Sequence, residues 1–402
     1  MINVDSALKI ILNDIRTLRG ESAHLTESLG RVLAEDIYAS SDIPGFDNSA
    51  MDGYALRALD TQNASKRIPK ILNVIEDRRA GYISRREIKN GQAIRIMTGA
   101  VMPKGSDSVV MVEDTQRHGK DNVKIFNPVK RGDSVRRKGE DIKKGEMVLV
   151  KGTRLNSAHV GLLASLGKAR VLVSRKPKIA ILATGDEVVD VGGKLKPGEL
   201  RSSNTYTLYS QILKCGGIPK NLGIAKDKPQ MLEAKLRSGL DCDMILTSGG
   251  VSVGDYDLVK FILAKMGTNI RFWKVAMRPG KPLVFGLVKG IPIFGLPGNP
   301  VSSMITFDVF VKPAMLKMEG ADDFSAKNVD AVLEEGITKR RGLRYFVRAI
   351  TRWDDGVYFT RTTGPQGSGI LKSMALANSL IVLPEEEENV DKGVRVTVRF
   401  LE

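Results

Sequence analysis

The chain has few cysteines and histidines for its 402 residues. Its 2 cysteines, Cys215 and Cys242, are too few for a disulfide framework, and its 3 histidines form no zinc-type spacing with them. Such cysteine usage is typical of a reducing compartment, so we expect a cytoplasmic protein. The segment MINVDSALKIIL lacks a signal-peptide pattern, and no apolar run approaches a membrane span. We therefore expect no membrane attachment.

Aromatic residues are also scarce, at 5%, whereas basic residues are in excess. The 62 Lys and Arg against 46 Asp and Glu give a net charge of +16, which favours an anionic partner. Nucleic acid, phosphorylated small molecules and a basic surface kept for solubility all fit this charge. No recognised nucleic-acid-binding motif accompanies it, so we expect no nucleic-acid partner. The Walker P-loop and the dinucleotide fingerprint GxGxxG are absent as well.

Length and composition predict a globular chain of two to four domains. From Pro177 onward, short apolar strands alternate with helical patterns, which predicts a mostly parallel sheet covered on both faces. A helix is expected over 4–18 and a small β-rich domain over 54–138, while alternation over 330–402 predicts a small antiparallel sheet or barrel. The sheet strands are expected at 178–184, 218–224, 243–247, 271–275, 283–286 and 292–295, and its helices at 203–215, 228–239 and 300–317.

The run DMILTSGGVSVGDYD, residues 243–257, organises this region. A short apolar strand breaks into Ser248, Gly249 and Gly250, and a helical pattern follows Gly254. In this layout, bare backbone N–H groups and a helix N-terminus face an anion. Asp255 and Asp257 lie just beyond the loop, where they either cap the helix or hold a cation that bridges phosphates.

Two further strands end in small-residue loops, TGDE at 184–187 and LPGNP at 296–300. A basic turn, WKVAMRPGKP, lies between them in the sequence. Ligands of parallel sheets bind beyond the carboxyl ends of the strands, so these loops are expected to share one site. The pattern predicts an anion held by amides and cations, with a divalent metal held by carboxylates. The charged candidates are Glu187, Asp227, Asp255, Asp257, Lys274, Arg278 and Lys281.

Several long motifs in this chain resemble those of one family, the molybdopterin molybdenumtransferases or MoeA family, which includes the gephyrin E domain. They occur in the same order and with similar spacing along essentially the whole chain. The motifs are PGFDNSAMDGYA, RIMTGAVMPKGSDSVVMVED, RRKGED, ILATGDEV, LTSGGVSVGDYD, RPGKP, GLPGNPVSS and GPQGSGILKSMALANSLIVLP. The segment 177–320 also resembles the MoaB/MogA-type domain that binds molybdopterin.

The resemblance implies a multidomain α/β plus β architecture. It consists of a MoaB/MogA-like α/β/α sandwich at 177–320, a small β-rich domain at 45–138, a discontinuous linking domain at 1–44 and 139–176, and a C-terminal barrel-like β domain at 321–402. Family members are homodimers. They take adenylylated molybdopterin and molybdate, release AMP with the help of Mg²⁺ or another divalent cation, and place the metal on the dithiolene. An upstream molybdopterin adenylyltransferase and downstream molybdoenzyme-maturation proteins are the implied partners.

Carried over motif by motif, the resemblance also implies functional residues. The catalytic positions are Asp52, Thr98, Asp141, Glu187, Asp227 and Asp257, of which Glu187, Asp227 and Asp257 would hold the metal. The substrate-binding positions are Ser248, Gly249, Gly250, Ser252, Lys274, Arg278, Lys281, Pro282, Pro297, Gly298, Asn299, Pro300, Arg348 and Ser368, with Arg344 as an alternative to Arg348. Two departures stand out: Arg278 replaces the lysine of many members, and RGLRYFVR lacks the acidic residue common in that segment.

Two other functions remain open. The chain could be a non-catalytic molybdopterin-binding scaffold, a reading that the intact acidic set disfavours. It could also perform the neighbouring step, adenylylation of molybdopterin, which MDGYA, MTGA and the C-terminal unit disfavour. The sequence leaves open whether the physiological metal is molybdenum or tungsten, because their oxyanions have nearly equal size and charge.

Overall fold

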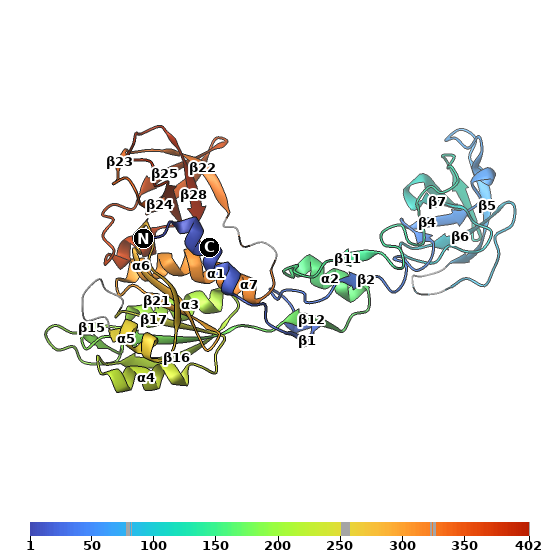
Figure 1. Cartoon of the computed structure of the whole chain (residues 1–402). Helices are drawn as coiled ribbons and strands as arrows, with labels where there is room; N and C mark the ends of the chain where they lie inside the picture. Colours follow the sequence, from blue (N-terminus) through green and yellow to red (C-terminus); the bar gives the residue numbers. More distant parts are fainter. Residues whose placement is uncertain (78–80, 82, 251–257, 322–323, 325–326, 402) are drawn as a thin grey trace. The chain divides into compact units, whose positions relative to one another are not determined.

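The computed structural model of the chain describes residues 1–77, 81, 83–250, 258–321, 324 and 327–401 (Figure 1). These residues fall into two compact units. The first comprises 1–35, 152–160 and 169–402, and the second comprises 36–151 and 161–168. Helix α2 (Ser157–Ser165) belongs partly to each unit. No helix among the described residues is long and apolar enough to cross a membrane.

The centre of the first unit is a six-stranded sheet with the order β16-β13-β17-β21-β20-β18. The first four strands are parallel, β20 is antiparallel to β21, and β18 is antiparallel to β20. The carboxyl ends of β13, β17, β21 and β18 therefore lie at the same edge as the start of β20. The bounds are β13 (Lys178–Thr184), β16 (Ile218–Ala225), β17 (Met244–Ser248), β18 (Asn269–Lys274), β20 (Pro282–Val288) and β21 (Ile291–Leu296).

Alternate residues of β13 supply two separate hydrophobic cores, because successive side chains of a strand point to opposite faces. Ile179 and Ile181 pack with helices α1, α3 and α6, whereas Ala180 and Leu182 pack with α4 and α5. The predicted α/β/α sandwich is thereby confirmed. The helices are α1 (Val4–Asp14), α3 (Ser203–Lys214), α4 (Pro229–Ser238), α5 (Leu258–Lys265) and α6 (Pro300–Thr306).

Two helices differ from the sequence prediction. The first ends at Asp14 instead of continuing to 18, since Ile15 adopts an extended backbone and places its side chain in the core. The helix expected over 300–317 consists of α6, a π-helical segment (Phe307–Val311) and α7 (Lys312–Met318). Pro313 lies in the first turn of α7 and has no N–H to donate, so the regular hydrogen-bond ladder is interrupted there.

The C-terminal part of the first unit is a closed five-stranded barrel, as predicted. Its strands pair in the ring β24-β25-β22-β28-β26 and back to β24. A further short strand, β19 (Met277–Arg278), pairs with β24 and joins the basic turn to the barrel. The bounds are β22 (Asn328–Leu333), β24 (Arg344–Asp354), β25 (Val357–Thr362), β26 (Ser379–Leu383) and β28 (Arg395–Phe400), with helix α8 at Leu371–Leu376.

The remaining pairs of the first unit are short. They are β1 (Gly20–His24) with β12 (Arg170–Ser174), β14 (Val188–Val189) with β15 (Leu200–Arg201), and β23 (Ile337–Thr338) with β27 (Asn389–Val390). The antiparallel β1–β12 pair joins two segments that are 146 or more residues apart in sequence. The discontinuous linking domain at 1–44 and 139–176 stays a prediction.

The second unit is built on a six-stranded sheet with the order β7-β4-β6-β5-β9-β8. This sheet forms the β-rich region predicted from the sequence. Two short pairs, β2 with β11 and β3 with β10, complete the unit. The bounds are β2 (Ile37–Tyr38), β3 (Asn48–Ser49), β4 (Gly53–Leu56), β5 (Lys70–Asp77), β6 (Gln92–Ile96), β7 (Ser108–Met111), β8 (Thr115–His118), β9 (Asn122–Ile125), β10 (Val135–Arg136) and β11 (Met147–Leu149).

Candidate functional site

A cavity of about 570 Å³ lies at the edge where β13, β17 and β21 end. Nine of the predicted site residues line it: Glu187, Ser248, Gly249, Gly250, Pro282, Pro297, Gly298, Asn299 and Pro300. The three small-residue loops therefore share one site, as their positions after parallel strands predicted. Thr184 of the TGDE loop lines it too, together with residues that were not predicted: Ala183, Val188, Leu200, Arg201, Ser202, Ser203 and Asn204.

Gly249 and Gly250 allow two of these loops to approach each other closely. Gly249 has a φ of +93°, and a Cβ atom there would lie 2.6 Å from the backbone oxygen of Thr184. Gly250 has a φ of +67°, and its Cβ atom would lie 2.6 Å from a methyl group of Val259. Any larger residue would combine an unfavourable backbone conformation with a clash. The loop therefore presents bare backbone to the cavity.

Gly185 allows the carboxylate of Glu187 to approach the backbone closely. Its φ is +135°, and a Cβ atom there would lie 2.6 Å from Glu187 Oε2. The Glu187 carboxylate therefore lies directly over the glycine backbone while the residue lines the cavity. This contact explains why glycine precedes the acidic pair in TGDE.

Asn204, in the first turn of α3, ties two of the loops together. Its Nδ2 donates to Ser248 Oγ at 2.7 Å and to the carbonyl oxygen of Gly298 at 2.8 Å. The residue is only 8% exposed, and its Oδ1 atom has no hydrogen-bond partner. From the sequence, Asn204 could be recognised only as a polar residue at the start of a predicted helix. The two loops that Asn204 bridges lie 44 and 94 residues away in sequence.

Carboxylates gather beside the end of β13. The backbone N–H of Asp227 donates to Asp186 Oδ1 at 3.1 Å. Burial, followed by the nearby negative charges of Asp186 and Glu187, raises the pKa of Asp227. Repulsion among these acids is therefore only partly compensated by Lys226, whose Nζ donates to the carbonyl oxygens of Asp186 and Val188.

The predicted metal ligands remain a prediction. Among the residues that the structure describes, no group of three or more His, Cys, Asp or Glu side chains is arranged to hold a metal ion. The third predicted ligand, Asp257, lies outside the described residues, as do Ser252 and Asp255.

The basic turn lies at the same edge of the sheet but contributes only Pro282 to the cavity wall. Lys274 ends β18 opposite Pro282, and the N–H of Val275 donates to the carbonyl oxygen of Lys281 at 3.0 Å. Arg278 lies in β19, with its guanidinium beside Tyr345 of the barrel. None of the three predicted cations lines the cavity, although Lys274 and Lys281 are neighbours of Pro282, which does.

The C-terminal loop 362–369 reaches the same site. Asn299 Nδ2 donates to Ser368 Oγ at 2.9 Å, and the N–H of Val301 donates to the carbonyl oxygen of Ser368 at 3.1 Å. The predicted residues Asn299 and Ser368, which come from different domains, are therefore in direct contact.

Arg348 and its alternative, Arg344, are absent from the cavity wall, and their predicted role stays a prediction. Arg348 is 0% exposed, and its guanidinium donates to the carbonyl oxygens of Pro365, Gln366 and Gly367 and to Ser373 Oγ. It is thus bound to the loop that carries Ser368 and does not face the cavity. Arg344 is occupied by ion pairs with Asp5 and Glu385.

In the second unit, three motifs converge on one surface. Ser49 exchanges backbone hydrogen bonds with Gly99 and Ala100, while Asn48 pairs with Arg136. The N–H of Asp141 donates to the carbonyl oxygen of Ile43 at 3.1 Å. A cavity of about 510 Å³ opens there, lined by Ile43, Pro44, Asn48, Arg136, Glu140 and Asp141.

Asp52 and Thr98, both predicted as catalytic, are hydrogen-bonded to each other. Asp52 Oδ1 accepts from the Thr98 N–H at 2.7 Å and from the Thr98 hydroxyl at 2.8 Å. These two donors, aided by the charge of Arg95, lower the pKa of Asp52, so its carboxylate is held ionised. A fixed anion suits orientation of a ligand better than proton transfer.

The fold and cavity define a ligand-binding α/β/α domain joined to a β-barrel. Family models match in the same order: the MoeA N-terminal region (domain I and II) at 2–167, a probable molybdopterin binding domain at 180–317, and the MoeA C-terminal region (domain IV) at 330–401. The chain belongs to the MoeA family.

Individual relatives agree along the whole length. The molybdopterin molybdenumtransferase of Bacillus subtilis is 38% identical over 100% of this chain and 94% of its own, and that of Haemophilus influenzae is 36% identical over 99% and 98%. The solved structure of the molybdopterin biosynthesis moeA protein from Pyrococcus horikoshii OT3 superposes with a TM-score of 0.87 at 34% identity, covering 100% of both chains.

Proposed function

We propose that this chain acts in molybdenum cofactor biosynthesis as a molybdopterin molybdenumtransferase. It would cleave adenylylated molybdopterin, release AMP, and transfer molybdenum from molybdate to the dithiolene. The observation that carries this proposal is the 570 Å³ cavity at the carboxyl edge of a domain that matches the molybdopterin-binding family model. Full-length similarity to transferases of that name supports it.

The cavity has the chemistry that a phosphorylated heterocycle needs. Gly249 and Gly250 offer bare backbone to phosphate oxygens, and the hydroxyl of Ser248 and the amide of Asn299 add polar groups. Glu187 is the single carboxylate in the described wall. These neutral donors, together with Arg201 and one acid in the wall, can bind a phosphate and still orient a polar ring.

The basic turn supplies charge for the second substrate. Lys274, Arg278 and Lys281 would hold the tetrahedral oxyanion through charge-assisted hydrogen bonds. In the transfer itself, two Mo–S bonds form and one oxygen of molybdate leaves as water with the two thiol protons. Molybdenum keeps its oxidation state, so the step needs no oxidant or reductant.

The carboxylates suit a divalent cation in chemical type, since hard cations such as Mg²⁺ prefer oxygen ligands. Burial and then the charges of neighbouring acids raise the pKa of Asp227, and a bound cation would relieve the repulsion among these acids. In this proposal Glu187, Asp227 and Asp257 hold the cation, which would neutralise charge on the phosphoanhydride. Glu187 and Asp227 also keep the site polar beside the small-residue loops.

AMP release from adenylylated molybdopterin, with and without molybdate, tests this function directly. We expect molybdate-dependent release by the unaltered chain and a loss of at least about 100-fold for Glu187→Gln. Glu386→Gln is the matched control, because Glu386 is an exposed residue of the barrel's acidic run. Tight binding of adenylylated molybdopterin without AMP release would instead favour the non-catalytic scaffold.

Two accompanying features of the proposal have tests of their own. A homodimer would have twice the 43.9 kDa mass of the chain in light scattering, whereas a monomer would overturn that part of it. Parallel assays with molybdate and tungstate at low concentration would identify the preferred metal.

A further inference from the structure

Arg278 and Tyr345 form a contact between the basic turn and the barrel. The two-residue strand β19 runs parallel to β24, in a register that places Arg278 beside Tyr345. Arg278 Nη1 donates to the Tyr345 hydroxyl at 3.3 Å, and its guanidinium carbon lies 5.5 Å from the centre of the tyrosine ring. The cation is therefore held by both the face and the hydroxyl of one aromatic side chain.

Burial and two further contacts restrain the tyrosine. It is only 8% exposed, and its hydroxyl also accepts from the backbone N–H of Arg340 at 3.2 Å. The ammonium of Lys339 lies 5.3 Å from the ring centre and is bound to the carbonyl oxygens of Glu385 and Glu387. A ring held in this way offers Arg278 a rigid support.

The contact positions Arg278 without cancelling its charge. Arg278 remains an exposed residue, and it has no ion pair with any described carboxylate. A carboxylate partner would neutralise the guanidinium, whereas a neutral phenol leaves its full charge for an anion. We propose that Tyr345 is a positioning residue that orients Arg278 toward the oxyanion substrate. This inference rests on the proposed function of the basic turn.

Steady-state kinetics of Tyr345→Phe and Tyr345→Leu test the inference. Loss of the hydroxyl should raise the KM for molybdate about 3-fold, and loss of the ring about 10-fold, with kcat and the KM for adenylylated molybdopterin within about 2-fold of the parent. Tyr358→Leu is the control, since Tyr358 packs against Trp353 and Phe400 of the same barrel. Thermal melts establish that each variant is folded.

A double-mutant comparison separates positioning from general barrel packing. In an Arg278→Ala background, Tyr345→Leu should raise the KM for molybdate by less than about 2-fold, because Tyr345 acts through Arg278. An equal rise in both backgrounds, or a fall in kcat alone, would overturn the inference.

Equilibrium dialysis with molybdate distinguishes failure of this inference from failure of the proposed function. Tyr345→Phe and Tyr345→Leu should each raise the dissociation constant for molybdate by the same factor as they raise the KM for molybdate. If the parent binds molybdate with this dependence but releases no AMP, the proposed function fails and the inference stands. If the parent releases AMP and neither Tyr345 variant alters molybdate binding, only the inference fails.

Discussion

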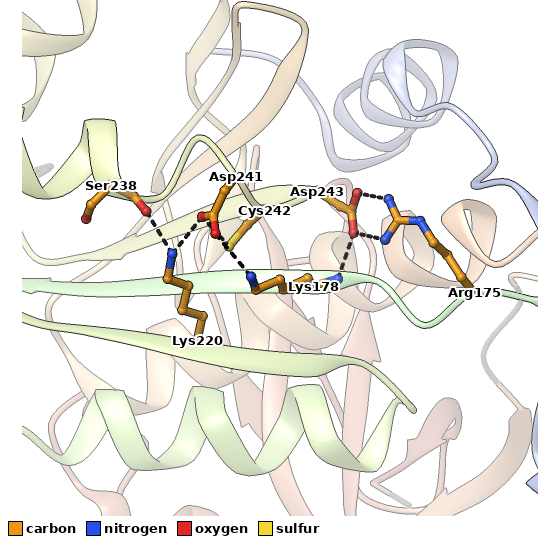
Figure 2. Close-up of polar contacts among 7 residues, drawn as sticks. All are labelled: Arg175, Lys178, Lys220, Ser238, Asp241, Cys242 and Asp243. Carbon is orange, nitrogen blue, oxygen red and sulfur yellow. Dashed lines mark hydrogen bonds and ion pairs between the residues drawn. The ribbon is translucent and has the colours of Figure 1, made fainter.

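The strands of the six-stranded sheet have different polar groups at their two ends. Charged side chains are paired at one end, whereas polar groups surround a cavity at the other. At the edge where β13 and β16 begin, Asp241 joins Lys220 at 2.6 Å and Lys178 at 3.1 Å (Figure 2). Next to it, Asp243 forms a two-pronged ion pair with Arg175 and accepts from the Lys178 N–H at 2.8 Å. At the carboxyl edge, glycine loops, an amide oxygen without a partner and neighbouring acids surround a cavity.

The pKa values of two aspartates express this difference. Hydrogen bonds from Lys220 and Lys178 lower the pKa of Asp241, whereas burial and neighbouring acids raise that of Asp227. The first edge stabilises its charges internally and ties three strands together. At the second, the Oδ1 atom of Asn204 has no hydrogen-bond partner and neighbouring acids repel one another. The two ends of the same strands therefore differ in how fully their charges are compensated.

Gly249→Ala should have the largest effect at the cavity edge. Its Cβ would meet the Thr184 carbonyl oxygen at 2.6 Å in a backbone conformation that alanine disfavours. We expect a destabilisation of about 1–3 kcal/mol and a loss of AMP release of at least about 100-fold. Denaturant unfolding and turnover measure these two effects. Gly192→Ala, which meets nothing within 4 Å, should change neither, and an active Gly249→Ala enzyme would contradict the role of this loop.

Asn204→Asp should come next. The change removes the donor that holds Ser248 Oγ and the Gly298 carbonyl oxygen, and it adds a negative charge beside that carbonyl. Loss of these buried hydrogen bonds should weaken adenylylated molybdopterin binding by roughly 30-fold. Isothermal titration calorimetry checks this, with Asn221→Asp, outside the cavity wall, as the control. Unchanged affinity would show that the two loops do not need the bridge.

Asp243→Ala tests the end of the sheet that lies away from the cavity. It leaves Arg175 and the Lys178 N–H without a partner where the Asp243 side chain is only 15% exposed. The free energy of unfolding should fall by about 2 kcal/mol, while kcat of the folded enzyme changes less than about 2-fold. Chemical denaturation and assays well below the melting temperature separate the two. A large loss of kcat would mean that this edge also serves the reaction.

Asp241→Asn should have the smallest effect, a modest loss of stability near neutral pH that disappears in acid. Because the folded pKa lies below the ordinary value of 3.8, the ionised carboxylate stabilises the fold above that pH, and this contribution is lost as pH falls through the folded pKa. Wild-type stability should therefore drop more steeply below about pH 4 than that of the variant. Melting temperatures across pH 2–7 test it, and parallel curves would contradict it.

Much of the first unit could be predicted from local pattern. The strand at 178–184 was predicted with its observed bounds because six apolar or small residues follow Lys178 between clear breaks. The three loops follow parallel strands, so topology alone brings them to one cavity. The surroundings of Arg348 are the opposite case: a short motif shows only a charged residue, whereas packing shows that loop carbonyl oxygens enclose its guanidinium.

The sequence by itself determined the alternation of strands and helices, the glycine positions and the family, because these depend on neighbouring residues and on motif order. Only the tertiary structure decided that Asn204 bridges two loops, that β24 closes a barrel with β26, and that Tyr345 supports Arg278. Those contacts join residues far apart in the chain. They depend on how the strands and helices pack, which local residue patterns do not specify.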